Sequence, residues 1–249
     1  MARRYSKRSI LDFDELNPLN TKINKRQFTK KSKDSKTSVD IDLSDDDKPN
    51  DPYREYFGKM FIEPEQMETR ITLAGQIEDV FFWTFTYWAL TVDIESAEDD
   101  IRQETKDKLR LVMSKHTKLD SYLERQIDKT VDEVIDTTLR HTYLLPDKEA
   151  ESDYWLSRDR AVLIAENETN SFENYIEYRD AVTSGKTKKK WITELDDRVR
   201  LTHELAEGQT VDIDGLFLIG DSLMRFPMDT LYDPSPNEII NCRCAVVYE

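Results

Sequence analysis

Between Pro64 and Pro146 the sequence has no proline, and between Gly75 and Gly185 it has no glycine. Proline and glycine are the residues that most often interrupt helices, so this long stretch leaves room for several of them. Within it, hydrophobic side chains recur every three or four residues, a spacing typical of a helix that buries one face. The middle of the chain is therefore predicted to form a helical bundle. The residues with this spacing are Leu119, Leu123, Ile127, Val131 and Val134, continued by Thr138.

An aromatic-rich segment of this stretch is hydrophobic nearly all the way around a helix; it contains Phe81, Phe82, Trp83, Phe85, Tyr87 and Trp88. Such a helix is either buried at the centre of the bundle or forms a surface patch that needs a partner, and we expect burial. The run 80–92 is 13 residues long and is broken by three threonines, which is too short to span a bilayer. The basic N-terminus is not followed by the apolar stretch of a secretory signal. We therefore expect no contact with a membrane.

A second helical block is expected over residues 153–182, followed by a lysine-rich segment. The triplet Gly185-Lys186-Thr187 resembles part of a phosphate-binding loop, but position 180 is Asp180 and a helix precedes the triplet. Gly185 is instead expected to close the helix in a left-handed conformation, with the neighbouring lysines in a solvated turn. Beyond Gly208, short apolar runs at 211–219 and 245–248 predict antiparallel strands, separated by a proline-bearing loop at 227–236.

These patterns, together with only 6 glycines, indicate the α+β class: a mostly helical N-terminal and middle region, with a small antiparallel sheet in the C-terminal domain. The predicted domains are residues 1–52, a basic arm and linker, residues 53–150, the helical bundle, and residues 151–249, the C-terminal domain.

Charge is distributed unevenly along the chain, which holds 36 Lys and Arg against 51 Asp and Glu. Residues 1–36 carry 11 basic and 4 acidic side chains, which leaves 25 basic and 47 acidic ones for the rest. Such an arm is a solvated tail, or it docks on an acidic surface or on nucleic acid phosphates. Residues 29–52 are almost devoid of hydrophobic side chains, which predicts a disordered or extended tether. The candidate DNA-binding residues are Arg3, Arg4, Lys7, Arg8, Lys25, Arg26, Lys30 and Lys31.

The segment after the lysines predicts one more helix, capped by Thr193 and ending before Gly208. Four residues would share its inner face, namely Leu195, Val199, His203 and Ala206. On another face Asp196 and Arg200 are four residues apart and can form an ion pair. The charged residues here could form an acid–base site, but a structural brace is the interpretation we favour; they are Asp196, Asp197, Arg198 and Arg200.

His203, Cys242 and Cys244 are the one set of His and Cys residues that could converge on a metal ion, and zinc suits two thiolates and an imidazole. The single residue between the cysteines is shorter than the usual zinc spacing, and a fourth ligand from Asp212 or Asp214 is a guess. We therefore expect no cofactor and a packed core of two buried thiols and a hydrogen-bonded histidine, with zinc as the alternative. A direct disulfide is not expected, because the two Cα atoms would be about 6.5–7 Å apart in a strand. With two cysteines in all, a reducing compartment is the simpler assumption.

Several of these elements together resemble the phage Mu F-like minor head protein family, the head-morphogenesis proteins of tailed phages. The resemblance begins at Arg160-Ala161 and Ile164–Glu168 and continues to the C-terminus over roughly 90 residues, within the predicted domain 151–249. Glu166 and Asn167 stand where family members usually have a basic residue, so no role is carried over to them. The shared motif consists of Trp191, Asp196, Asp197, Arg198, Arg200, His203, Gly208, Asn241, Cys242, Arg243 and Cys244.

The resemblance implies a minor capsid protein of the virion that lies in the capsid interior near the portal, after assembly in the host cytoplasm. It implies a role in phage head morphogenesis, that is, in viral capsid assembly and DNA packaging or DNA ejection. The implied partner is the portal protein, with scaffold or major capsid protein as further candidates and packaged DNA as a candidate for the basic arm. No catalytic motif that we recognise occurs in the sequence, so no enzymatic activity is expected. The alternative is a metal-dependent hydrolase or transferase-type effector carried in the phage head, built around His203.

Overall fold

The computed structural model describes residues 52–144 and 153–249 of the chain. The basic arm, with all the candidate DNA-binding residues, lies outside these ranges, and so does most of the predicted tether. The described residues belong to one compact unit.

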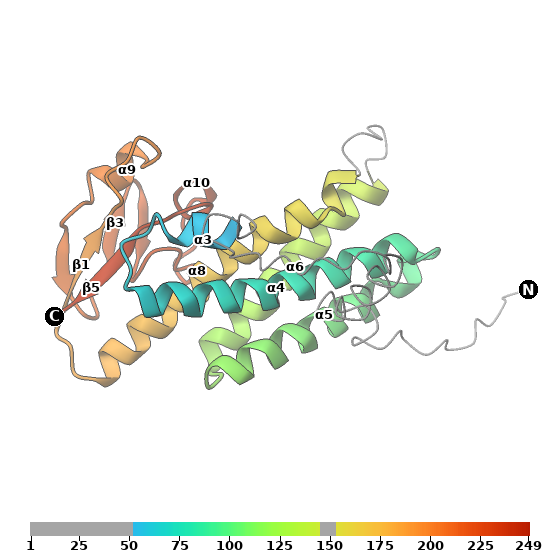
Figure 1. The fold of residues 1–249 in the computed structure, drawn as a ribbon, viewed down its shortest axis with the longest axis horizontal. Coiled ribbons are helices and arrows are strands. Elements are labelled where there is room, and N and C mark those ends of the chain that lie inside the picture. Colours follow the sequence, from blue (N-terminus) through green and yellow to red (C-terminus); the bar gives the residue numbers. More distant parts are fainter. Residues whose placement is uncertain (1–51, 145–152) are drawn as a thin grey trace, which may run out of the picture. The chain divides into compact units, whose positions relative to one another are not determined.

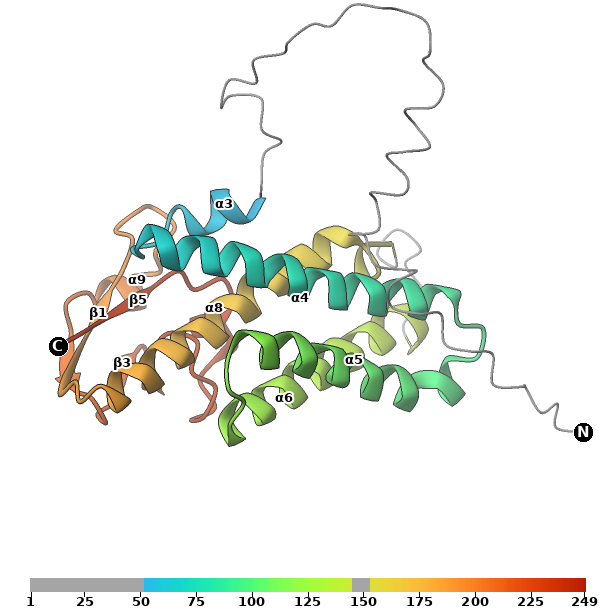
Figure 2. The same cartoon turned by 60° about the horizontal axis from the view of Figure 1, so that its bottom comes forward.

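Long helices occupy the middle of the chain, as the absence of proline and glycine predicts (Figures 1 and 2). They are α4 (Pro64–Leu90), α5 (Ile94–His116) and α6 (Ser121–Leu139), preceded by the short α3 (Pro52–Phe57) and followed by a π-helical turn, η4 (Arg140–Leu144). The starts of the long helices are set by local chemistry. Pro64 opens α4, and the Asp93 and Asp120 side chains accept backbone N–H groups at the starts of α5 and α6.

The aromatic segment is buried in the core, as expected. Phe81 and Phe85 are inaccessible to solvent, and Trp83 and Trp88 are nearly so. The predicted stripe on α6 is also confirmed, because Leu123, Ile127 and their successors along the helix are buried while Leu119 is partly buried. These side chains, with Ile101, Leu109 and Met113 of α5, form the larger of two hydrophobic cores.

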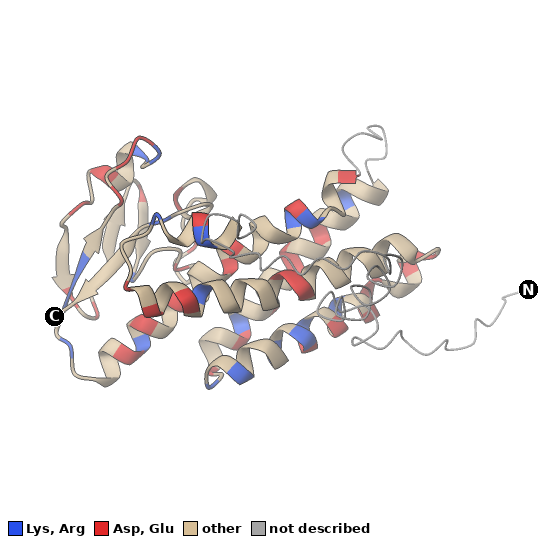
Figure 3. Cartoon of the chain, viewed as in Figure 1, with Lys and Arg blue, Asp and Glu red and all other residues tan. Residues whose placement is uncertain are grey.

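Ion pairs join α5 to α6, and both helices contain positively and negatively charged residues (Figure 3). Arg102 binds the carboxylates of Asp132 and Asp136 across the two helices, at 3.0 and 2.7 Å. Arg110 reaches Glu124 in the same way, at 2.8 Å. The high content of charged residues therefore serves, in this region, to join neighbouring helices.

The helix α8 (Arg158–Thr183) lies along α4 and shares its core. Ala161, Ala165 and Phe172 are fully buried there. The guanidinium of Arg70 on α4 is fully buried as well and joins the two helices. The division of the chain at residue 150 stays a prediction, and the described residues on its two sides pack against each other.

At its C-terminus α8 ends as predicted. Gly185 has a φ of 79°, and the amides of Gly185 and Lys186 donate to the carbonyls of Val182 and Ala181. The predicted solvated turn of lysines is wrong, because Lys188–Ile192 forms strand β1. Alternation along this strand turns Lys189 inward, where its ammonium lies 4.8 Å from the centre of the Tyr178 ring.

The C-terminal region contains the predicted antiparallel strands, in two small sheets (Figure 1). The first has the order β2-β1-β5, with β2 at Thr210–Asp212 and β5 at Ala245–Tyr248. The second is a hairpin of β3 (Phe217–Ile219) and β4 (Ser222–Met224). The expected run 211–219 is thus divided between two sheets, and β1 and β4 were not predicted. The α+β class is confirmed.

A second, smaller core lies between these strands. It contains Trp191, Phe217, Ile219, Met224 and both cysteines. The short helices α9 (Leu201–Glu204) and α10 (Pro236–Ile239) border it. Within the described ranges, none of the helices combines the length and the apolar character needed to cross a membrane.

Candidate functional site

The segment between β1 and β2 differs from its prediction. Residues 193–200 form a loop, and only Leu201–Glu204 are helical, as α9. Leu195 has a φ of 52° and is 69% exposed, so it does not face inward, whereas His203 and Ala206 are buried as predicted. The predicted Thr193 cap is wrong as well: Thr193 lies just after β1, and its amide donates to Glu207.

The predicted pair of Asp196 and Arg200 is replaced by contacts with the C-terminal motif. The Asp196 carboxylate binds the Arg243 guanidinium at 2.7 Å, and the same contact lowers the pKa of Asp196. Arg200 donates to the carbonyl of Ile240. These contacts join two segments that are about 40 residues apart, so the predicted pairing along one helix is wrong. The choice of a structural brace over an acid–base site stays a prediction. Asp197 and Arg198 are exposed.

Trp191 and Gly208 frame this loop. Trp191 is fully buried and packs edge-on against the rings of His203 and Phe217, at 5.8 and 5.2 Å between ring centres. Gly208 has a φ of 74°, and its amide donates to the Trp191 carbonyl at 2.9 Å. Glycine suits this position because a side chain disfavours a positive φ. The loop from 193 to 207 is thus held at both ends against β1.

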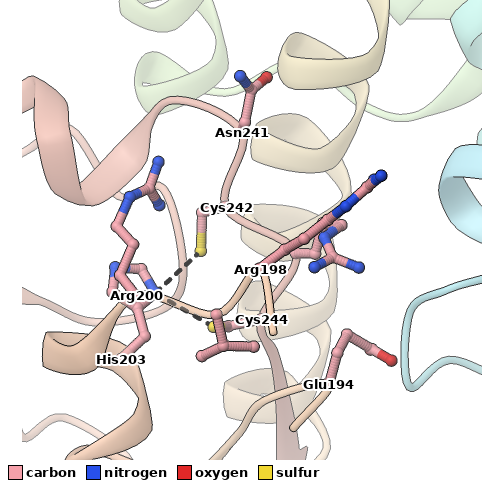
Figure 4. Close-up of a pocket in the computed structure, with 9 residues that line it drawn as sticks. Glu194, Arg198, Arg200, His203, Asn241, Cys242 and Cys244 are labelled. Atoms are coloured by element: carbon pink, nitrogen blue, oxygen red, sulfur yellow. Dashed lines mark hydrogen bonds between the residues drawn. The ribbon is translucent and has the colours of Figure 1, made fainter. Parts of the chain in front are cut away.

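His203, Cys242 and Cys244 converge below this loop (Figure 4). The Nδ1 atom of His203 lies 3.2 Å from Sγ of Cys244 and 3.6 Å from Sγ of Cys242. The three candidate ligand atoms are all within 4.8 Å of one another, and all three side chains are at most 4% exposed. Both thiols are free. Cys242 and Cys244 precede strand β5 instead of lying in it, and Asn241, with a φ of 56°, makes the turn that leads into them.

The other ring nitrogen of His203 has a carboxylate partner. Its Nε2 lies 3.0 Å from Oε2 of Glu238, which also accepts the Thr202 hydroxyl at 2.8 Å. A carboxylate at Nε2 favours the tautomer with its proton there, which leaves the Nδ1 lone pair facing the sulfurs. Glu238 was not among the predicted residues, since an acidic residue at the start of a short helix gives no sequence signal for this role.

The two thiols are electrostatically distinct. The neighbouring Cys244 thiol favours the charged form of Cys242, so the pKa of Cys242 is lowered and the pKa of Cys244 is raised. When the His203 ring is protonated at both nitrogens, its Nδ1–H faces the Cys242 sulfur, and the two groups favour each other's charged form. The pKa of His203 is therefore raised although burial opposes its charge. Cys242 is therefore the more readily ionised of the two sulfurs.

Helix α8 fixes the cysteine segment from the other side. Asn170 donates to the carbonyl of Cys242 at 2.7 Å, and Asn167 accepts the amide of Asn241 at 2.7 Å. Asn170 also accepts a hydrogen bond of 2.6 Å from the buried Arg70. These contacts place the cysteines relative to the large helical core. Asn167 is one of the residues to which the resemblance gave no role.

The group of His203, Cys242 and Cys244 has the donor atoms of a metal site. Within the described part of the chain, no further His, Cys, Asp or Glu joins this group, so neither Asp212 nor Asp214 supplies a fourth ligand. A small hollow next to the group is lined by three arginines, by Glu194 and by Asn241; the arginines are Arg198, Arg200 and Arg243.

No family model, curated protein or solved structure matches this chain.

Proposed function

We propose that this protein is a minor head protein of a tailed phage, with a role in head assembly and in DNA packaging or delivery. The observation that carries the proposal is the meeting of two distant parts of the motif on which the resemblance depends. Asp196 contacts Arg243, and His203 contacts both Cys242 and Cys244, across 39–47 positions of sequence. If the motif resembled the family only by chance, its residues would not be expected to contact one another in the fold.

The size of the site favours a structural role over a catalytic one. The hollow beside the group has a volume of about 20 Å³, which is room for about one water molecule. A hydrolase or transferase needs a cleft that admits a substrate, and ligand pockets are usually more than ten times larger. The enzyme alternative is supported by the donor set alone, because three protein ligands leave one coordination position for a reactant.

In this proposal a zinc ion bound by His203, Cys242 and Cys244 would join the loop of residues 193–207 to the C-terminal segment. The small second core, built on strands of three to five residues, gives such a link structural value.

The proposed partners are proteins of the head, first the portal protein and then scaffold or major capsid protein. Leu201 and Leu205, four residues apart at α9, are 69% and 78% exposed, which suits a chain that is covered on assembly. Packaged DNA is the proposed partner of the basic arm, and the proposed location is the interior of the capsid.

A mass-spectrometric inventory of phage particles tests this proposal. Particles are purified from the host that carries the gene, after induction, and separated into DNA-filled heads and empty procapsids. We expect the protein in both fractions, at a few copies per portal. Its absence from both fractions, together with its presence in the host lysate, would overturn the proposal.

A further inference from the structure

We infer that His203, Cys242 and Cys244 bind a zinc ion, with Glu238 as a positioning residue. This inference rests on the geometry of the described residues and does not depend on the proposed role in a phage head. It concerns a metal bound by Nδ1 of the histidine and by both sulfurs.

The spacing of the donor atoms suits a zinc ion. With zinc–sulfur bonds of about 2.3 Å, zinc–nitrogen bonds of about 2.0 Å and tetrahedral angles, a nitrogen and a sulfur on one zinc ion are about 3.5 Å apart. The distances from Nδ1 of His203 are 3.2 Å to Cys244 and 3.6 Å to Cys242. The two sulfurs should be about 3.8 Å apart, and all three atoms lie within 4.8 Å of one another. The two nitrogen–sulfur distances therefore agree with a bound zinc ion to within a few tenths of an ångström, and the sulfur–sulfur distance lies within the 4.8 Å limit.

The environment of the His203 imidazole is that of a metal ligand. Metal-bound histidines usually donate their other N–H to a carboxylate or carbonyl, which fixes the ring and its tautomer. Glu238 occupies this place at 3.0 Å from Nε2, and Thr202 orients Glu238 through the same carboxylate oxygen. The Nδ1 lone pair is thus presented to the two sulfurs, where a metal would lie.

The charge of the loaded site also suits burial. A Zn²⁺ ion bound by two thiolates and a neutral imidazole has no net charge, so the complex can lie in the small hydrophobic core without an uncompensated charge. The backbones of two of the three ligands are held by hydrogen bonds, since Asn170 donates to the Cys242 carbonyl at 2.7 Å and the amide of His203 donates to the Arg200 carbonyl at 2.9 Å. The site is therefore largely formed before the metal binds. Three protein ligands leave the fourth position to water or to an exogenous ligand.

Metal content of the purified full-length protein gives the direct test. We expect about one zinc per chain after purification without chelator, and less than about a tenth of this in Cys242→Ser/Cys244→Ser. His141→Asn is the matched control, because His141 lies outside the group and stacks on Trp155, and it should keep its zinc. Glu238→Gln should still bind zinc but about 10–100-fold more weakly, as expected for a residue that acts through His203.

Cobalt substitution keeps the test decisive even if the cysteine variant fails to fold. The parent protein, stripped of zinc and reloaded with Co²⁺, should show thiolate-to-cobalt absorption in the near ultraviolet and the visible bands of tetrahedral cobalt. A parent protein that is folded by circular dichroism but holds no zinc and gives no thiolate-to-cobalt band would overturn the inference. Equal metal content in the parent and in a folded cysteine variant would overturn it too.

Discussion

Replacing Arg70 with Met should destabilise the protein by about 3 kcal/mol. The side chain of Arg70 is fully buried and donates to Asn170 at 2.6 Å, to Asn174 at 3.4 Å and to Glu177 at 2.7 Å. Its removal leaves a mostly buried carboxylate and two buried amide oxygens without their donor. Breaking a buried ion pair by removing one partner costs about 3–5 kcal/mol. We expect the lower end of this range because Gln66 still donates to Glu177 at 3.0 Å.

Urea unfolding followed by circular dichroism measures this cost as a shift of the midpoint at unchanged slope. Arg54→Met is the matched control, because the Arg54–Glu68 pair is more than half exposed and should contribute less than about 1 kcal/mol. The double variant Arg70→Met/Glu177→Gln should recover part of the loss, since it removes the unpaired charge as well. If Arg70→Met were no more destabilising than Arg54→Met, the argument that this clamp joins α4 to α8 would be refuted.

Three further predictions concern the core, the pH dependence and the arm. Leu109→Ala should lower the free energy of unfolding in urea by about 2–5 kcal/mol, because Leu109 is fully buried. Leu111→Ala, on the same helix but 55% exposed, should lower it by less than about 0.5 kcal/mol. Equal losses for the two variants would contradict the packing of α5. Burial raises the pKa of Glu168 from its ordinary 4.5 to about 7, so the unfolded chain ionises first and stability falls as the pH rises between these values. Glu168→Gln should therefore gain stability relative to the parent from pH 5 to pH 8, and a constant difference would show that this carboxyl is not perturbed. Shortening the chain to begin at Pro52 should abolish DNA binding at low salt, and binding by the full chain should weaken steeply with salt. Equal binding by both chains, or by neither, would disprove the DNA role of the arm.

The helices could be predicted from the sequence because their signals are local. The proline-free stretch and the regular hydrophobic spacing agree with the packing that is observed. The caps at Asp93 and Asp120 are local signals too, although they were not among the predicted features. The segment after β1 could not be predicted, although Thr193 and Asp196 have the spacing of a capped helix. Asp196 instead binds Arg243, 47 positions later, and this contact outweighs a weak local preference. Lys189 was predicted to lie in a solvated turn because it is charged. In the structure its hydrophobic stem is buried, and its ammonium lies over the rings of Tyr178 and Phe217.

The candidate site was predicted in part. His203, Cys242 and Cys244 are rare residue types, so their common site could be expected from the sequence. Their supporting residues could not, because Glu238 and Asn170 are ordinary polar residues whose role appears only when distant segments meet. The expected core of two buried thiols and a hydrogen-bonded histidine and the alternative of a zinc site both agree with the buried group that is observed. That both sulfurs face the same ring nitrogen is a property of the three-dimensional arrangement.

X-ray absorption at the zinc edge tests the central claim about this site most directly. The purified protein, loaded with one equivalent of zinc, should show two sulfur neighbours at about 2.3 Å and one imidazole nitrogen at about 2.0 Å, with a single further light atom. A first shell made only of nitrogen and oxygen atoms would contradict the claim that Cys242 and Cys244 bind the metal together with His203.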